Sequence, residues 1–207
     1  GYSLTWSGQY EYMQKANKNL TMVVPVTIVL IALLLYLAFR RVAYVLIIMG
    51  TLPMALAGSF WLMYLLGYNM SVAVAVGLIA LAGVTTEIGV VLLVYLNQSV
   101  AAYVSKCKAD GQSLDYSGLR DAVRDGALLR LRPIAMTAVA IISGLLPVMV
   151  GAGTGSEVMR RIAAPMVGGM TSSLILTMLV IPAVYLLWEW RRLRRSGEAS
   201  PKSIEQS

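Results

Sequence analysis

Histidine is absent from the 207 residues, and cysteine occurs only once, as Cys107. Without histidine the chain cannot build a histidine-based metal site or catalytic triad, and a single cysteine cannot form an intrachain disulfide. The sequence also has no phosphate-binding glycine loop, no metalloprotease helix and no nucleophile elbow. We therefore expect neither an enzyme nor a bound cofactor.

Charge is scarce as well. Only 13% of the residues are charged and 58% are hydrophobic, whereas a soluble domain has about 25% charged and about 45–50% apolar residues. The apolar residues fall in blocks that match the roughly 20 residues a bilayer-spanning helix needs. The sequence predicts an all-α integral membrane protein with five transmembrane helices, at about residues 20–39, 42–66, 70–96, 133–150 and 162–190.

The net charge is +7. The basic residues stand at the ends of the apolar blocks, so they indicate membrane topology and not a nucleic-acid surface. Thirteen of the 17 lie on one side of the predicted membrane and four on the other. The larger group is Arg40, Arg41, Lys106, Lys108, Arg120, Arg124, Arg130, Arg132, Arg191, Arg192, Arg194, Arg195 and Lys202; the smaller is Lys15, Lys18, Arg160 and Arg161. The positive-inside rule then places the carboxy terminus in the cytoplasm.

The chain divides accordingly. We expect residues 1–19 to end an external domain, 20–96 to form three membrane helices and 133–195 the last two, and 196–207 to be a disordered tail. Residues 97–132 form the one long cytoplasmic loop. Apolar Leu119 and Val123 alternate there with charged Arg120 and Arg124, which predicts an amphipathic helix along the membrane surface or against the bundle; the alternative is a partly ordered connector. Because the sequence starts at Gly1 in a polar stretch, we expect it to be a piece of a longer protein.

Glu87 is the main candidate functional residue, because it is the one acidic residue near the middle of a predicted span. An ionised carboxylate in a membrane costs several kcal/mol, so such a residue usually faces a cavity or a partner and has a role. Gly77, Ala80 and Gly83 share roughly its helix face, and small residues predict that this face packs inward. The alternative is a neutral glutamate bonded to a neighbouring helix.

Two weaker candidates follow. Thr137 could pass a proton to a carboxylate on another helix, although a threonine in a helix more commonly bonds to its own backbone. Met159 lies at the external membrane surface, where a thioether could bind a soft metal such as Cu(I); most of the 12 methionines are better read as packing residues.

Four stretches resemble heavy-metal efflux pumps of the RND family. They are residues 1–11 (GYSLTWSGQYE), 80–87 (ALAGVTTE), 131–137 (LRPIAMT) and 153–166 (GTGSEVMRRIAAPM), and the likeness is greatest to the copper- and silver-exporting branch. The resemblance implies a trimeric, twelve-helix pump of the bacterial inner membrane that couples inward proton flow to metal export through a periplasmic adaptor and an outer-membrane channel. This chain would supply the last five helices.

The resemblance also implies roles for individual residues. Glu87 matches the membrane glutamate of the proton relay, Thr137 a relay threonine of the wider superfamily, and Met159 a methionine of the metal path. One position departs from the branch, because Ile134 stands where a relay lysine is expected. Three explanations are open: a residue outside this segment replaces the missing lysine, the protein belongs to another metal branch, or its pumping is impaired. The other readings are an RND pump for organic compounds and an inactive membrane fragment.

Overall fold

The computed structural model describes residues 9–111, 114–151 and 153–195, and every regular element in these ranges is a helix. The six helices are α1 (Gln9–Phe39), α2 (Val42–Met49), α3 (Thr51–Leu65), α4 (Val72–Ala109), α5 (Tyr116–Val150) and α6 (Ser156–Arg195). Five segments are long and apolar enough to cross a membrane, with α2 and α3 together making one of them. The prediction of an all-α membrane protein with five spans is confirmed.

The second span is broken at Gly50, because α2 ends just before this residue and α3 begins just after it. Pro53 explains the break, because proline has no N–H to donate to the carbonyl of Met49 one turn earlier. The hydroxyl of Thr51 donates to the carbonyl of Ile48 at 2.7 Å and so satisfies one backbone group at the bend. The predicted single helix over 42–66 is therefore two helical pieces joined at a bend.

The predicted cytoplasmic loop over 97–132 is mostly helical. α4 runs on to Ala109, and α5 begins at Tyr116, whose N–H donates to the Asp115 carboxylate at 2.8 Å. The amphipathic helix is thus the first half of α5, continuous with the fourth span, and of the two predicted placements it has the one against the bundle. Its apolar stripe is buried against neighbouring helices, since Leu119 and Val123 belong to the main apolar cluster. Residues 1–8 and the predicted tail, 196–207, lie outside the described residues.

Small residues allow α3 and α6 to cross at close range. Methyl groups added at Gly168 would lie 2.6 Å from Cβ of Leu62 and 2.7 Å from the carbonyl oxygen of Gly58, closer than atoms can approach. The close approach lets the Ser59 hydroxyl donate to the carbonyl of Pro165 at 2.6 Å. Membrane helices commonly associate in this way, because lipid gives apolar side chains no incentive to cluster.

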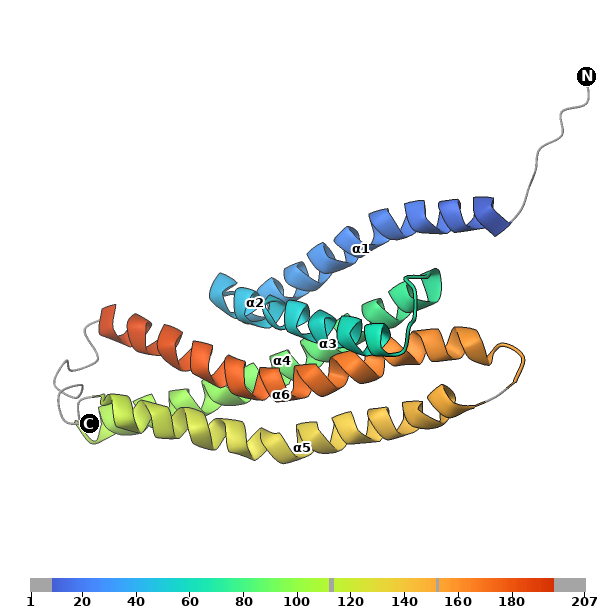
Figure 1. The fold of residues 1–207 in the computed structure, drawn as a ribbon. Helices are drawn as coiled ribbons and strands as arrows, with labels where there is room; N and C mark the ends of the chain where they lie inside the picture. The colour runs from blue at the N-terminus through green and yellow to red at the C-terminus, as the bar shows by residue number, and fades with distance from the viewer. Residues whose placement is uncertain (1–8, 112–113, 152, 196–207) are drawn as a thin grey trace, which may run out of the picture.

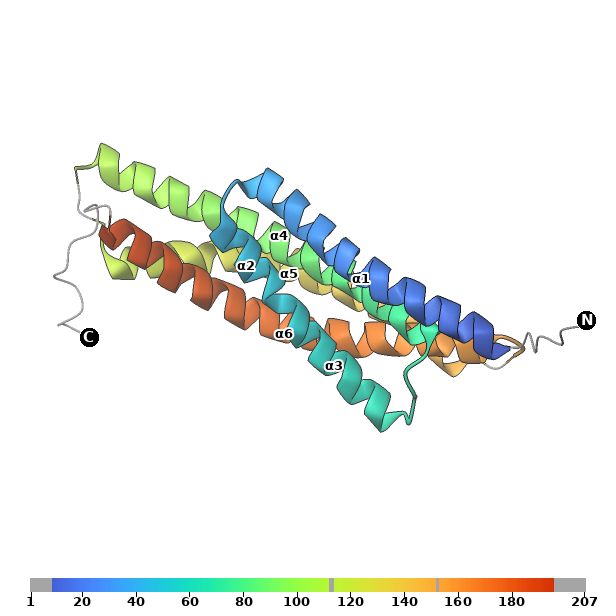
Figure 2. The same cartoon turned by 90° about the horizontal axis from the view of Figure 1, so that it is seen from above.

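The long helices α4, α5 and α6 run side by side along the molecule, and α1 lies on the opposite side of the bundle from α5 (Figure 1). The start of α1 and the end of α6 lie at opposite ends in both views, as an odd number of spans requires (Figures 1 and 2). The turn after α1, the turn between α4 and α5 and the end of α6 share one end of the bundle. We call this the basic end, because most of the arginines lie there; its cytoplasmic location remains a prediction.

Candidate proton and metal sites

Glu87 lies in the middle of α4 and is exposed, as are Val76, Ala80 and Gly83 on the same stripe of the helix. No other helix covers this stripe within the described ranges, so the inward packing of the face stays a prediction. Gly77 does pack closely, against the backbone carbonyl of Ile162 in α6, but a methyl group at Gly83 would meet no atom within 4 Å. Gly77 lies on the neighbouring face of α4, with buried Leu81 and Ile88, whereas Glu87 and its stripe face outward.

No hydrogen bond or ion pair holds the Glu87 carboxylate within the described ranges. The neighbouring hydroxyl of Thr86 donates to the carbonyl of Ala82 in the same helix at 2.8 Å, so it does not serve Glu87. A carboxyl group in a membrane span without a polar partner is costly. Glu87 therefore needs a partner, a proton or water from beyond these five helices.

Thr137 lies in α5 and is also exposed, and its hydroxyl donates to the carbonyl of Pro133 at 3.1 Å. This bond, four residues back in the same helix, is the common arrangement for a threonine in a membrane helix. It leaves the hydroxyl oxygen free to accept a second hydrogen bond. No hydrogen bond joins Thr137 to Glu87 in the part of the chain that is described, so these five helices do not bring the two residues together.

Ile134 is buried, at 6% exposure, in the apolar cluster that also holds Ile88 of α4 and Ile181 of α6. The isoleucine side chain fills this space with hydrocarbon where a lysine would place a charge.

Met159 lies in the first turn of α6 and is 58% exposed. Nearby, the Arg160 guanidinium donates through Nε to the carbonyl of Gly151 at 3.1 Å and ties the start of α6 to the end of α5. No cluster of three or more histidine, cysteine, aspartate or glutamate residues occurs within the described ranges. A single thioether is too few ligands for a metal ion, so a site at Met159 would need further donors from other segments.

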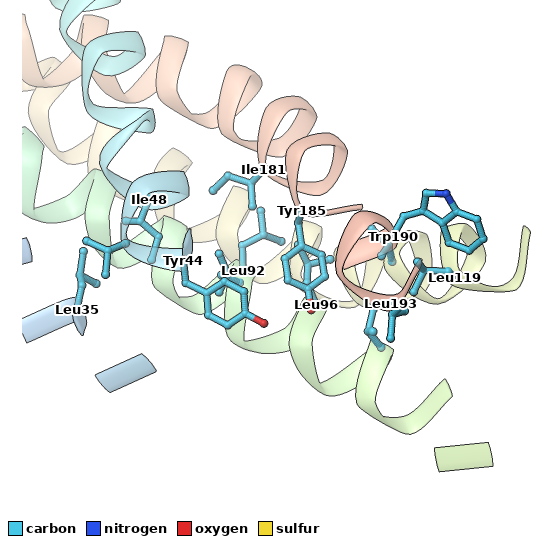
Figure 3. Close-up of a cluster of buried hydrophobic side chains, with 14 of the residues drawn as sticks. Leu35, Tyr44, Ile48, Leu92, Leu96, Leu119, Ile181, Tyr185, Trp190 and Leu193 are labelled. Atoms are coloured by element: carbon cyan, nitrogen blue, oxygen red, sulfur yellow. The ribbon is translucent and has the colours of Figure 1, made fainter. Parts of the chain in front are cut away.

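The sequence analysis missed a polar cluster near the basic end, in which Tyr44, Tyr185 and Glu189 are buried and Asn97 is exposed. The hydroxyl groups of Tyr44 in α2 and Tyr185 in α6 both donate to Oδ1 of Asn97 in α4, at 3.1 and 3.3 Å. The two tyrosines lie next to each other within the apolar cluster (Figure 3). One turn further along α6, Glu189 is only 2% exposed and pairs with Arg192 at 2.9 Å. Glu189 looked like an ordinary span-end residue, because an arginine run follows it directly.

Comparison with known proteins extends the resemblance. The family model for the AcrB/AcrD/AcrF family matches residues 1–189. The putative cation efflux system protein SilA of Salmonella typhimurium is 48% identical over 196 residues, which make up 95% of this chain and 18% of SilA. The cation efflux system protein CusA of Escherichia coli K12 is 48% identical over 197 residues, covering 94% of this chain and 19% of CusA. The chain therefore spans about a fifth of the length of these relatives.

The fold agrees with the sequence match. A crystal structure of a heavy metal efflux pump superimposes with a TM-score of 0.74 at 30% identity, over 92% of this chain and 18% of the pump. The cobalt-zinc-cadmium resistance protein CzcA of Cupriavidus metallidurans is 39% identical over 187 residues, 90% of this chain and 16% of CzcA. The chain thus belongs to the AcrB/AcrD/AcrF family.

Proposed function

We propose that this chain is the carboxy-terminal membrane part of a proton-driven efflux pump for heavy-metal cations, with Cu(I) and Ag(I) as the favoured substrates. The observation that carries the proposal is Glu87, a carboxyl group in mid-membrane that none of its own five helices neutralises. Such a group suits proton transport, because it can hold a proton when its surroundings are dry and release it when water enters. The relatives described above, which are named as cation efflux or metal resistance proteins, support metal cations as the transported substrate.

The exposed stripe of α4 fits this role. Ala80 and Gly83 leave room for another helix to approach close to Glu87, and small residues are what a tightly packed membrane interface uses. We infer that helices from the rest of the pump cover this stripe and bring the partner that Glu87 lacks. Thr137 would accept or donate a hydrogen bond at the same interface.

At the other end of the spans, Met159 would offer its thioether to the metal. The side chain is exposed and soft, and it stands at the membrane surface opposite the basic end. The complete protein would be a homotrimer in the bacterial inner membrane, multi-pass with a cytoplasmic carboxy terminus, and would work with a periplasmic adaptor and an outer-membrane channel.

Metal resistance of cells that carry the full-length pump tests the proposal. Met159→Ala should lower resistance to Cu(I) or Ag(I) at unchanged expression, because it removes a metal ligand. Met136→Ala is the matched control, since Met136 in α5 is 64% exposed on a span face and should only contact lipid. Equal resistance of the two variants would make Met159 a packing residue. Protection against zinc or cobalt alone would assign the pump to another metal branch.

A further inference from the structure

One hydroxyl group inside the bundle has no partner. Thr85 of α4 is 1% exposed, and its Oγ1 makes no hydrogen bond within the described ranges. Other threonines of these helices donate to the backbone carbonyl four residues earlier, which is the common arrangement in a helix. They are Thr27, Thr86, Thr137 and Thr171. Thr85 does not use that carbonyl, and because these helices already cover it, its partner has to lie between them.

The Thr85 side chain lies on the face of α4 that packs against α6. One turn before it, the Leu81 side chain fills the space beside Gly169 of α6. One turn after it, a methyl group at Gly89 would lie 3.7 Å from Cδ1 of Ile181. Residues four apart in a helix share a face. Thr85 therefore lies opposite the part of α6 between residues 169 and 181.

That part of α6 has two hydroxyl groups on the same face. Ser173 and Thr177 follow Gly169 at intervals of four residues, are both 0% exposed, and have their hydroxyl oxygens 3.4 Å apart. With Thr85, three buried hydroxyl groups thus face one another across the contact of α4 and α6. Each carries one proton, and the single hydrogen bond among the three, between the two α6 residues, uses only one of these protons. Two donors are left to be satisfied.

α3 adds a fourth hydroxyl group at this level. Thr51 is 1% exposed and donates to the carbonyl of Ile48, so its oxygen can still accept a hydrogen bond. Ile48 lies 3.3 Å from where a methyl group at Gly89 would be, and the hydroxyl of Ser172 donates to the carbonyl of Met54 at 3.3 Å. Thr51 stands midway between these two contact points, and so at the level of the hydroxyl groups of α4 and α6.

A water molecule suits these groups better than an ion does. Water donates two hydrogen bonds and accepts two, so it can serve hydroxyl groups that need donors and acceptors alike. A cation would need a negative charge close by, since an unpaired charge in a dry site is costly. Glu87 is only two residues from Thr85, about 3 Å along the helix axis, but its side chain is exposed on the outward face of α4.

We propose that Thr85, Ser173 and Thr177 bind a buried water molecule between α4 and α6, with the hydroxyl oxygen of Thr51 as a further acceptor. The water would join three helices near the middle of the spans, next to the break in the second span. Since these helices alone enclose the site, it depends neither on the remaining segments of the pump nor on the metal that the pump carries.

A structure of the full-length pump, determined by electron cryomicroscopy at a resolution that shows ordered water, tests the site directly. Density for one water should lie about 2.5–3.0 Å from Oγ1 of Thr85 and from a hydroxyl oxygen of α6. A Thr85 hydroxyl that donates to the carbonyl of Leu81, or to α6 without water, would overturn the proposal. A density with several oxygen contacts of about 2.3–2.6 Å would show a hard cation and would also overturn it.

Thermal unfolding of the same pump gives an independent result, whose sign is decisive. Thr85→Val keeps the shape of the side chain and removes the hydroxyl group. It should remove the water density and lower the melting temperature, because Ser173 and Thr177 lose the bridge. An unchanged or raised melting temperature would show that the hydroxyl had no partner, since an unbonded buried hydroxyl is replaced without loss. Thr85→Ser should retain the water. The matched control is Thr86→Val, which should also retain it, because the Thr86 hydroxyl bonds only to its own helix.

The losses caused by Thr85→Val and Thr177→Val should not be additive. When one water links the two residues, the double variant loses less stability than the sum of the single variants, because either change alone already breaks the bridge. Additive losses would show that the two hydroxyl groups act separately and would contradict the shared water.

Discussion

Gly168→Ala offers the most direct test of how the helices are packed. The new methyl carbon would lie 2.6 Å from Cβ of Leu62 and 2.7 Å from the carbonyl oxygen of Gly58. Neither atom can rotate away, because both are fixed to the α3 backbone. Normal carbon contacts are about 3.5–4.0 Å, so α3 and α6 would have to separate by roughly 1 Å.

This separation has a cost that can be worked out from the structure. It would stretch the 2.6 Å bond from Ser59 to the carbonyl of Pro165 beyond hydrogen-bond range. Losing the bond costs about 0.5–1.5 kcal/mol, and overpacking costs about 1–3 kcal/mol. Replacing a helical glycine with alanine recovers about 1 kcal/mol. We therefore expect Gly168→Ala to destabilise the pump by about 0.5–3.5 kcal/mol.

The assay is thermal unfolding of the full-length pump in detergent. Gly144→Ala is the control, because a methyl group at Gly144, in the second half of α5, would meet no atom of another described helix within 4 Å. It should leave the melting temperature unchanged or raise it, whereas Gly168→Ala should lower it. If both variants melt at the wild-type temperature, the close crossing of α3 and α6 is wrong.

Three other predictions follow from single contacts. Tyr44→Phe removes the bond to Asn97 and should cost about 0.5–1.5 kcal/mol in unfolding, whereas Tyr64→Phe, at an 83% exposed residue, should cost nothing measurable. Thr137→Val should reduce proton-driven transport; Thr171→Val should not, although the Thr171 hydroxyl makes the same kind of bond within its helix, at 2.8 Å to Val167. With the buried Cys107 replaced by alanine, a membrane-impermeant thiol reagent applied outside the cell should label a cysteine at Gly155 but not one at Asp110; the opposite pattern would reverse the orientation.

The sequence predicts the spans well, because each needs about 20 apolar residues in a row and nothing else in the chain has that pattern. It does not predict the continuation of α4 and α5 beyond the membrane. Residues 97–132 are polar enough for a loop, but buried apolar residues, among them Val100, Leu119 and Val123, pack the segment into the bundle. Helix length there is decided by tertiary packing, which local composition does not show.

The candidate sites were predicted unevenly for a similar reason. Glu87 is evident from its position alone, but which face of α4 packs against α6 depends on tertiary contacts, which the small residues do not reveal. Glu189 was overlooked because a glutamate beside an arginine run normally lies at a wet membrane surface. Its burial, at 2% exposure, comes from the packing of the bundle, which the local sequence does not show.

Proton flux driven by a metal gradient is the most direct test of the proposed function. The full-length pump is reconstituted in vesicles with a pH-sensitive dye inside, and Cu(I) or Ag(I) is supplied on one side. Wild type and Asp125→Asn, which removes an exposed acid of α5, should both move protons when metal is present. Glu87→Gln keeps the size and hydrogen bonding of the side chain but cannot carry a proton, so it should show no metal-dependent flux while still forming trimers. Glu87→Asp should retain part of the flux. Normal flux in Glu87→Gln would contradict the account and leave Glu87 a structural residue.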